Sequence, residues 1–374
     1  MKVAIVHEWF SEYAGSEKVT EQIIELFPDA DLYALVDVLK PETRAFLKHK
    51  HVTTSFIQKL PFSTRKFRNY FPLMPFAIEQ LDLSGYDLII SSSHAFAKGV
   101  ITGPDQLHIC YCHSPIRYAW DFQNQYLRDA GLNTGIRGLI LRWFLHKIRI
   151  WDVRTANGVD LFIANSSYIR RRIRKVYGRS SKVIHPGVSI EKFSVGVEKE
   201  DYFLTASRLV PYKRVDIIVE AFVRMPEKKL KVIGDGPGMS NIKHMARKSP
   251  NIEILGYQDF STLRHNMQRA KAFIFAAEED FGIIPVEAQA CGTPVLAYGK
   301  GGVKDSVIDG VTGLFFENQT AQSICDVVSE FDDGSRAFDS NTIRSHAKLF
   351  SNERFREEFM HAVYEIMSEK EGLL

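Results

Sequence analysis

Short apolar runs alternate with longer amphipathic stretches along almost the whole chain. The first run covers residues 2–7 and is followed by a helical pattern over 16–27. Short apolar runs of this kind are typical of buried parallel strands, and the stretches between them are long enough for connecting helices. The pattern therefore predicts an α/β protein with parallel sheets. The expected strands are 2–7, 32–36, 86–91, 107–112, 160–164, 182–184, 202–206, 230–233, 252–255, 272–276, 294–297 and 313–316.

The length of the chain predicts more than one domain. Its 374 residues are too many for one hydrophobic core and suit two domains. The sequence HPGV at 185–188 interrupts the regular pattern, so we place the boundary there. The expected parts are an N-terminal domain over 1–185, a C-terminal domain over 186–351 and a last helix within 352–374.

Composition narrows the class of protein. The 48 basic and 45 acidic residues nearly balance, which argues against a dedicated nucleic-acid binder. The four cysteines show no Cys-x-x-Cys spacing, so we expect reduced thiols in a cytoplasmic protein and no zinc site. Asp29 and Asp31 stand where a helix gives way to a strand, so we expect no metal there. No apolar stretch approaches the ~20 residues that span a bilayer.

One stretch, residues 273–297, combines two apolar runs with two spaced carboxylates. Gly282 allows a tight turn after the first run, and a helix should follow it. Glu279 then precedes this helix and Glu287 lies in its first turns, at the carboxyl edge of a parallel sheet. Backbone N–H groups at a helix N-terminus suit phosphate, and carboxylates suit sugar hydroxyls. A nucleotide sugar contains both, although without further context solvated helix charges would be the better explanation of the two glutamates.

Further motifs accompany this stretch. Arg208 and Lys213 stand in SRLVPYK, a glycine-rich turn GDGPG covers 234–238, and Gly301–Gly302 precede DGVTGLFF. Together with Glu279-x7-Glu287, these motifs resemble glycosyltransferase family 4, the retaining sugar transferases of the GT-B fold. HEWF near the start and YCHSPIRYAWD at 111–121 look most like the bacterial O-antigen mannosyltransferases within that family. The resemblance implies two Rossmann-like, doubly wound parallel-sheet domains facing across a cleft, the first on the acceptor side and the second binding the nucleotide sugar.

The resemblance also implies roles for individual residues. Glu279 would hold sugar hydroxyls, Glu287 the ribose, Arg208 and Lys213 the diphosphate, and His113 the reacting face of the sugar. The catalytic set is thus His113, Arg208, Lys213 and Glu279. The donor-binding set is Gly15, Gly234, Gly256, Tyr257, Phe281, Gly282, Ile283, Ile284 and Glu287. A tight strand-to-helix turn explains the glycines of 234–238 equally well, and an ordinary turn remains an alternative for Gly15.

The expected reaction is transfer of a glycosyl group, with retention, from a nucleotide sugar to a hydroxyl of a glycan acceptor in bacterial surface polysaccharide synthesis. The nearer resemblance implies GDP-mannose as the donor, with a UDP-sugar as the alternative, and a polyprenyl-diphosphate-linked glycan as a candidate acceptor. The donor is a substrate, and no cofactor or metal is expected. A nucleotide-sugar epimerase and a non-catalytic nucleotide-sugar sensor remain alternatives. A dehydrogenase is opposed by the missing Gly-x-Gly-x-x-Gly fingerprint after the first strand.

Two segments, 64–80 and 136–151, are basic and aromatic together. A helical wheel places Arg142, His146 and Arg149 on one stripe of the second segment, so it could rest on an anionic membrane surface. A domain helix with a charged exposed edge explains the pattern equally well. The basic run 170–175 adds further cations or a solvated helix face. The protein is therefore expected to be cytoplasmic, with attachment to the inner face of the cytoplasmic membrane left open.

Overall fold

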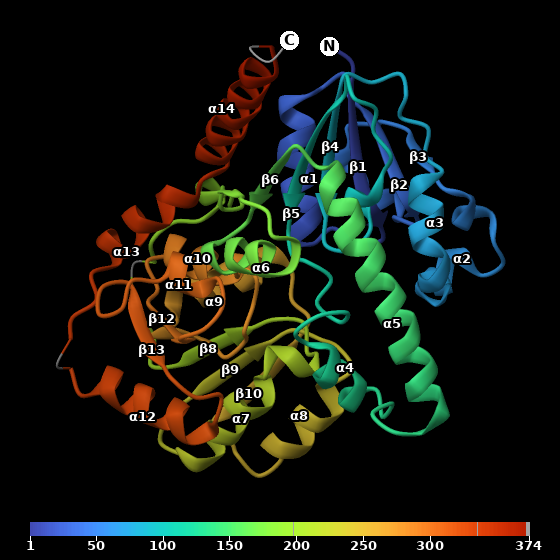
Figure 1. Ribbon diagram of the computed structural model, residues 1–374. Helices are drawn as coiled ribbons and strands as arrows, with labels where there is room; N and C mark the ends of the chain where they lie inside the picture. The colour runs from blue at the N-terminus through green and yellow to red at the C-terminus, as the bar shows by residue number, and fades with distance from the viewer. Residues whose placement is uncertain (197, 335, 372–374) are drawn as a thin grey trace. The chain divides into compact units, whose positions relative to one another are not determined.

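The structure is a computed structural model that describes residues 1–196, 198–334 and 336–371 (Figure 1). The chain divides into two compact units. Unit 1 contains Met1–Gly187 together with the chain from Phe355 onward, and unit 2 contains Val188–Arg354. Each unit contains one sheet, of seven strands in unit 1 and six in unit 2 among the residues described, and every strand pairing is parallel. The predicted fold class, two Rossmann-like parallel-sheet domains, is confirmed.

The sheet of unit 1 has the order β3-β2-β1-β4-β5-β6-β7. Its strands are β1 Val3–Phe10, β2 Asp31–Asp37, β3 Val52–Thr54, β4 Leu88–Ser93, β5 Leu107–Cys112, β6 Leu161–Ala164 and β7 Lys182–Val183. Its α-helices are α1 Gly15–Leu26, α2 Ser63–Lys66, α3 Met74–Glu79, α4 Gln123–Asp129, α5 Gly135–Thr155, α6 Ser167–Tyr177 and, from Phe355 onward, α14 Asn352–Glu371. β4 and β5 are buried along their whole length, because helices cover both faces of the sheet.

The last helix, α14, belongs to the core of unit 1. Phe355 and Phe359 are fully buried there, in one cluster with Ile23 of α1 and Tyr111 of β5. The Phe355 and Tyr111 rings lie 5.7 Å apart, centroid to centroid. The C-terminal end of the chain therefore packs on the same sheet as its N-terminal strand.

The sheet of unit 2 has the order β10-β9-β8-β11-β12-β13. Its strands are β8 Phe203–Ala206, β9 Leu230–Ile233, β10 Ile252–Gly256, β11 Ala272–Phe275, β12 Val295–Tyr298 and β13 Gly313–Phe316. Its α-helices are α7 Val215–Arg224, α8 Met239–Ala246, α9 Phe260–Arg269, α10 Ile283–Ala290, α11 Val303–Ser306, α12 Ala321–Asp332 and α13 Ser340–Ala347. One core cluster lies on each face, with Phe222 of α7 in one and Val286 of α10 in the other.

Three strands differ clearly from the sequence prediction. β4, Leu88–Ser93, lies two residues later than the predicted 86–91. β1 extends to Phe10, three residues past the predicted end at His7. The polar side chains of His7 and Glu8 interrupt the apolar pattern of the sequence, although both are completely buried. β3, Val52–Thr54, was not predicted. It is a three-residue edge strand with only Val52 buried, so the sequence shows no apolar run there.

Candidate active site

Each sheet has one point where the chain changes its winding direction. In unit 1 this point lies between β1 and β4, and in unit 2 between β8 and β11. Open parallel sheets bind ligands outside the carboxyl ends of their strands at such switch points. The predicted catalytic residues follow strands that border or neighbour these points. His113 follows β5 in unit 1, and Lys213 and Glu279 follow β8 and β11 in unit 2.

Lys213 and Glu279 form an ion pair in unit 2. Lys213 ends the 3₁₀ helix η8, Pro211–Lys213, and Glu279 lies in the loop between β11 and α10. The side chains are 16% and 15% exposed, so the pair is largely screened from water but remains open at the surface. The residue after Lys213, Arg214, adopts a left-handed conformation with φ of 54°, which turns the chain directly into α7. The structure thus joins two of the predicted residues into one charged site.

The start of α10 lies next to this pair along the chain. Gly282 caps the helix with φ of 88°, a conformation that favours glycine. The following residues, Ile283 and Ile284, are half-buried at the first turn, where backbone N–H groups have no acceptor within the helix. Phe281 is buried against Phe350, with ring centroids 5.7 Å apart. Glu287 lies on the same helix and is only 8% exposed, so its carboxylate is not the solvated helix charge that the sequence left open.

Gly301 and Gly302 hold the loop that carries Glu279. The Gly302 N–H donates to the Glu279 carbonyl oxygen at 2.8 Å. A Cβ atom on Gly302 would overlap the carbonyl oxygen of Asp280. A Cβ atom on Gly301 would lie 2.5 Å from the carbonyl oxygen of Glu279. Glycine is therefore required at both positions because backbone packs on backbone, and this packing fixes the position of the Glu279 loop.

The glycine-rich turn after β9 packs against the segment that leads to Lys213. Gly234 has φ of 135°, and a Cβ there would overlap the Ser207 carbonyl oxygen. The Gly238 N–H donates to the Leu209 carbonyl oxygen at 2.9 Å. The tight-turn explanation thus accounts for these glycines by protein packing, and a direct contact of Gly234 with a nucleotide stays a prediction. Arg208, in the same segment, has an exposed side chain.

The remaining donor-binding candidates lie at the surface. Gly256 ends β10 with φ of 69°, and a Cβ added to it would meet no atom within 4 Å, so its conformation rather than crowding favours glycine. Tyr257 follows with a side chain that is 80% exposed. In unit 1, Gly15 is the exposed first residue of α1. No contact in the structure tests the predicted roles of these three residues.

In unit 1, His113 belongs to a buried polar network centred on Ser92. The Ser92 hydroxyl is hydrogen-bonded to His113 Nε2 at 2.8 Å and to His7 Nδ1 at 3.1 Å. It also accepts from the Thr20 hydroxyl at 3.1 Å. His7 Nε2 lies 3.4 Å from a Glu17 carboxylate oxygen. One serine at the end of β4 therefore connects side chains from β1, α1 and the residue after β5.

The electrostatics of this network keep His113 neutral. Burial lowers the pKa of His113 well below its usual value, and the neighbouring imidazoles of His94 and His7 lower it further. Burial alone would raise the pKa of Glu17, but the hydrogen bond and charge of His7 hold it at about 2. Near neutral pH the site therefore offers an uncharged imidazole beside an ionised carboxylate.

Glu8 anchors the loop after β4, and the sequence prediction did not single it out. Its fully buried carboxylate accepts from the Ser93 hydroxyl at 3.0 Å. It also accepts from four successive backbone N–H groups, those of His94, Ala95, Phe96 and Ala97, at shortest distances of 2.6 to 3.0 Å. Burial opposes ionisation, whereas His94 and the N–H groups of Phe96 and Ala95 lower the pKa of Glu8. The sequence signal that could have identified Glu8 is the acidic residue of HEWF, which stands at the end of the first predicted strand.

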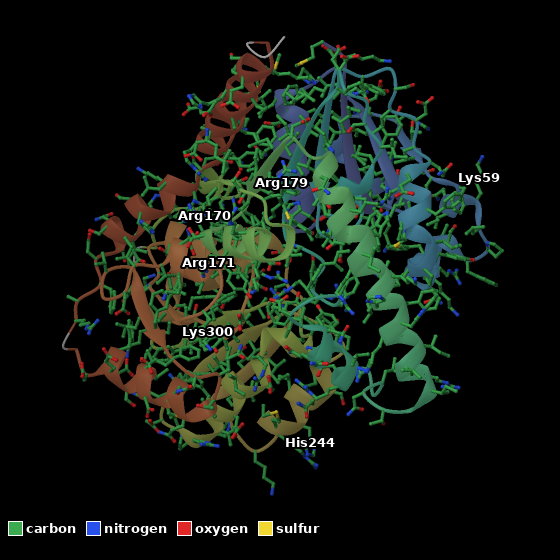
Figure 2. The ribbon with its side chains drawn as sticks, in the orientation of Figure 1. Lys59, Arg170, Arg171, Arg179, His244 and Lys300 are labelled. Carbon is green, nitrogen blue, oxygen red and sulfur yellow. The ribbon has the colours of Figure 1, made fainter. Side chains whose placement is uncertain are left out.

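Two cations behave differently from the sequence expectation. Arg172 does not belong to a solvated face: it is buried, and its guanidinium donates to Asp121 and to Ser114. Arg170 and Arg171 are exposed on the same helix, α6 (Figure 2). Arg149 of α5 is also turned inward, and it donates to the Ala119 carbonyl at 2.9 Å. The predicted basic stripe on α5 therefore lacks this arginine.

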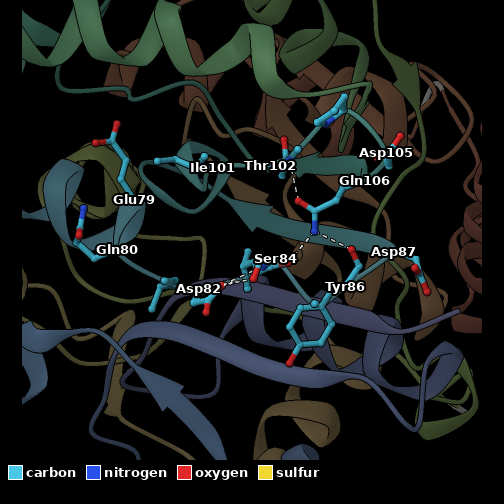
Figure 3. Close-up of a pocket in the computed structure, with 15 residues that line it drawn as sticks. Glu79, Gln80, Asp82, Ser84, Tyr86, Asp87, Ile101, Thr102, Asp105 and Gln106 are labelled. Carbon is cyan, nitrogen blue, oxygen red and sulfur yellow. Dashed lines mark hydrogen bonds between the residues drawn. The ribbon is translucent and has the colours of Figure 1, made fainter.

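A pocket of unit 1 lies away from the His113 network (Figure 3). It has a volume of about 720 Å³ and lies among the segments that lead into β4 and β5, at the amino ends of these strands. The Gln106 amide in it donates to the Leu83 and Tyr86 carbonyls, both at 2.6 Å. His113 lies at the opposite, carboxyl edge of the sheet, so this pocket is not part of the candidate site.

The described part of the chain contains no cluster of three or more residues suited to hold a metal ion. None of its helices is both long and apolar enough to span a bilayer.

Two family descriptions match the chain. "Glycosyl transferases group 1" matches residues 188–337, and "Glycosyltransferase Family 4" matches residues 14–192. The matches adjoin near the division between the two units and together reach from α1 to the region after α12. The chain belongs to the family-4 glycosyltransferases of the GT-B fold.

The individual relatives that match the chain share only low sequence identity with it. The chain is 27% identical over 233 residues to a D-inositol 3-phosphate glycosyltransferase of Kribbella flavida, covering 53% of this chain and 55% of the relative. It is 27% identical over 206 residues to a GDP-mannose-dependent α-(1-6)-phosphatidylinositol monomannoside mannosyltransferase of Mycolicibacterium smegmatis, covering 47% and 54%. The chain thus spans about half the length of these curated relatives. The crystal structure of Anabaena Alr3699/HepE in complex with UDP matches with a TM-score of 0.70 at 18% identity, covering 98% of this chain and 100% of that one, which shows the shared fold.

Proposed function

We propose that the protein is a retaining glycosyltransferase that moves a sugar from a nucleotide sugar to a hydroxyl of a glycan acceptor. The observation that carries the proposal is the Lys213–Glu279 ion pair at the switch point of the unit 2 sheet, beside the start of α10. A cation and a helix N-terminus suit a diphosphate, and a carboxylate suits sugar hydroxyls. An epimerase or a sensor would need the same donor site, so turnover with an acceptor distinguishes them.

The proposed chemistry follows from where charge develops. As the bond between the sugar and the phosphate breaks, negative charge grows on the diphosphate. Lys213, Arg208 and the N–H groups at the start of α10 would stabilise that charge, and preorganised donors of this kind are each worth about 3–4 kcal/mol. Glu279 would both orient the sugar hydroxyls and hold Lys213 in place before the donor binds. The departing phosphate would accept the proton of the acceptor hydroxyl, so that the step needs no further base.

Glu287 and the unit 1 network have separate roles in this proposal. Glu287, buried on α10, would accept hydrogen bonds from the ribose. His113 would act on the acceptor side as a neutral group, because its lowered pKa makes it a hydrogen-bonding partner rather than a cation. Ser92 and His7 would hold its ring in one orientation through the hydrogen bonds of the network.

GDP-mannose is the proposed donor, and a UDP-sugar is the second candidate. The named activity of the Mycolicibacterium relative supports the first, and the UDP complex of the structural neighbour favours the second. The test incubates the full chain with GDP-mannose, UDP-glucose, UDP-galactose and UDP-N-acetylglucosamine, with and without a lipid-linked glycan acceptor. Mass spectrometry of the product should show one hexose added from GDP-mannose only. If no donor yields a glycosylated product, the proposed function is wrong.

We also propose that the protein attaches to an anionic membrane surface through α5. Trp143 and Ile136 on this helix are 55% and 75% exposed, and residues 135–151 contain no acidic side chain. Apolar contact and attraction to anionic lipid would act together. Co-sedimentation with phosphatidylglycerol vesicles at low salt should fall when Ile136 and Trp143 become Ser, and an equal bound fraction in this variant and the wild type would reject the attachment.

A further inference from the structure

Unit 1 contains an apolar pocket of about 360 Å³ beside its polar network. The pocket is formed by β1, the 3₁₀ helix η4 (Phe67–Leu73), α3, α4, α5 and two loops, one after β4 that carries Phe96 and one after β5 that carries Tyr118. Its lining is mainly aromatic and aliphatic, with Trp9, Phe71, Phe96, Tyr118, Leu127 and Leu145 among its side chains. Trp9 lies two residues after His7 on β1, so the pocket borders the same carboxyl edge of the sheet as the His113 network.

One side of this pocket carries a cation. Arg68 is exposed, and its guanidinium lies 4.7 Å from the centroid of the Phe67 ring and 5.7 Å from that of the Trp9 ring. No acidic residue lines the pocket within the described part of the chain, and Gln123 is its other strongly polar side chain. The pocket therefore suits a ligand that is apolar over most of its length and anionic at one end.

The helix that closes the pocket is apolar on two sides. Leu141 and Leu145 of α5 line the pocket, whereas Ile136, Ile140 and Trp143 of the same helix are exposed. Burying apolar side chains is favourable, so an exposed apolar set on one helix marks a surface suited to an apolar partner. A hydrocarbon chain in the pocket would continue the apolar surface that α5 presents outside.

We propose that this pocket binds the hydrocarbon chain of an amphipathic acceptor whose phosphate lies against Arg68. Hydrocarbon contact with the aromatic walls supplies affinity, and the guanidinium supplies a charge-assisted contact to the phosphate. The edge-to-face packing of Phe71 against Tyr118, with centroids 5.4 Å apart, gives the pocket a rigid wall. That the bound molecule is an acceptor rests on the proposed glycosyl transfer, whereas the binding itself does not.

The test measures binding of farnesyl diphosphate, below its micelle concentration, to the full chain by titration calorimetry. Ala130 lines the pocket and is exposed, so Ala130→Trp should fill the pocket without disturbing the core. We expect this variant to bind farnesyl diphosphate at least about tenfold more weakly, since most of the apolar contact is lost. Ala130→Ser is the matched control and should bind as the wild type does.

The charged end is tested by a second pair of variants. Arg68→Ala should bind farnesyl diphosphate about tenfold more weakly and bind uncharged farnesol unchanged, because only the contact to the phosphate is lost. Lys66 is an exposed cation that does not line the pocket, and Lys66→Ala should leave both affinities unchanged. Equal binding by wild type and Ala130→Trp would overturn the proposal. Absence of farnesol binding to the wild type would overturn it as well, because it would show an anion site without a chain pocket.

The same variants separate this inference from the proposed function. GDP and UDP affinity should be unchanged in Ala130→Trp, because all residues that line the pocket belong to unit 1, whereas the residues proposed above to hold the diphosphate and the ribose, Arg208, Lys213 and Glu287, belong to unit 2. If farnesyl diphosphate binds as expected while no nucleotide sugar is turned over, the pocket stands and the transferase proposal fails. If nucleotide sugar is turned over while Ala130→Trp binds farnesyl diphosphate normally, the transferase proposal stands and the pocket assignment fails.

Discussion

The two switch points occupy the same position in their sheets but hold different chemistry. In unit 1, Ser92 joins His113 and His7 into a buried network of hydrogen bonds. In unit 2, Lys213 and Glu279 form an ion pair that is partly open to water. Parallel-sheet topology determines where each site lies, because it brings the ends of the two bordering strands together. The side chains placed there then determine which kind of ligand each site can hold.

The difference between the two sites suits separate roles in the proposed reaction. A neutral imidazole and hydroxyl can position a hydroxyl group without attracting a highly charged diphosphate. A cation near a helix N-terminus attracts the diphosphate and stabilises the charge that grows on it. Loss of the unit 2 cation should therefore affect catalysis and donor binding together, whereas substitutions in the unit 1 network should affect turnover and spare nucleotide affinity.

The largest expected effect follows from breaking the ion pair. Lys213→Ala should lower kcat by about 10²- to 10³-fold, the loss found for removal of one preorganised donor to a developing anion. GDP affinity should fall as well, since the diphosphate loses a cation. Steady-state kinetics with the preferred donor measures the first effect and calorimetry with GDP the second. Lys243→Ala, an exposed cation on α8, is the matched control. A kcat within about twofold of wild type would remove Lys213 from the mechanism.

Loss of the imidazole in unit 1 should give a smaller effect of a different type. His113→Ala should lower kcat by about 10- to 100-fold, because an orienting hydrogen bond near the acceptor is lost. GDP affinity should stay as in wild type. His51→Ala, an exposed histidine after η2 (Ala45–Leu47), serves as the control. If GDP binding weakens as much as turnover does, the functional separation of the two sites fails.

The ribose contact of Glu287 should affect binding more than chemistry. Glu287→Gln keeps the size of this buried side chain and weakens its acceptor for ribose hydroxyls. We expect the KM for the donor to rise by about tenfold with little change in kcat, the signature of a contact made equally in ground and transition state. Glu227→Gln, an exposed residue after α7, is the control. A drop in kcat at unchanged KM would instead assign Glu287 to the reacting centre.

Much of the unit 2 site could be predicted from the sequence because its signals are local. Glu279, Gly282 and Glu287 stand in one strand–turn–helix segment, and apolar runs mark both ends of it. The packing partners of the glycines were not predictable, since Gly302 meets Asp280 and Gly234 meets Ser207 only after the loops fold together. A glycine pattern therefore predicts a close approach of the backbone, but it does not identify the group that the backbone approaches.

The unit 1 network was largely hidden for the opposite reason. Ser92, His7 and Thr20 are far apart in the sequence and meet only because β1 pairs with β4. Polar residues inside a strand also weaken the apolar pattern, which is why β1 was predicted too short. The fold was therefore more predictable than the polar side chains that the fold buries.

Backbone packing at the unit 2 site gives an effect on stability. Gly302→Ala should lower stability by about 1–3 kcal/mol, because a Cβ there must displace the Asp280 backbone. Gly158→Ala is the control, since its Cβ would meet nothing within 4 Å. Thermal unfolding of the two variants, followed by circular dichroism, measures the difference. Equal unfolding midpoints would show that the Glu279 loop tolerates displacement and is not fixed by this contact.

The smallest predicted effect is a dependence of unit 1 stability on mild acid. Burial lowers the pKa of His108 to about 4, and burial likewise lowers that of His113 well below its usual value. Between about pH 6.5 and the folded-state pKa, the unfolded chain binds protons that the folded unit does not, so stability falls as the pH falls through this window. The loss should reach roughly 1 kcal/mol per histidine at about pH 5.5.

Comparing the two units makes this prediction specific. His108→Asn removes one titrating group and should flatten the fall in stability between about pH 7.5 and 5.5, even if the variant is less stable throughout. Hydrogen exchange of β5 amides follows unit 1, and exchange of β12 amides follows unit 2, where the half-buried His346 also has a pKa lowered by burial. Because His108 in β5 and His113 directly after it have the more strongly lowered pKa values, β5 should lose more protection than β12. Equal losses in both strands would mean that the buried imidazoles do not set the acid sensitivity of unit 1, and the electrostatic contrast between the two sites would no longer hold.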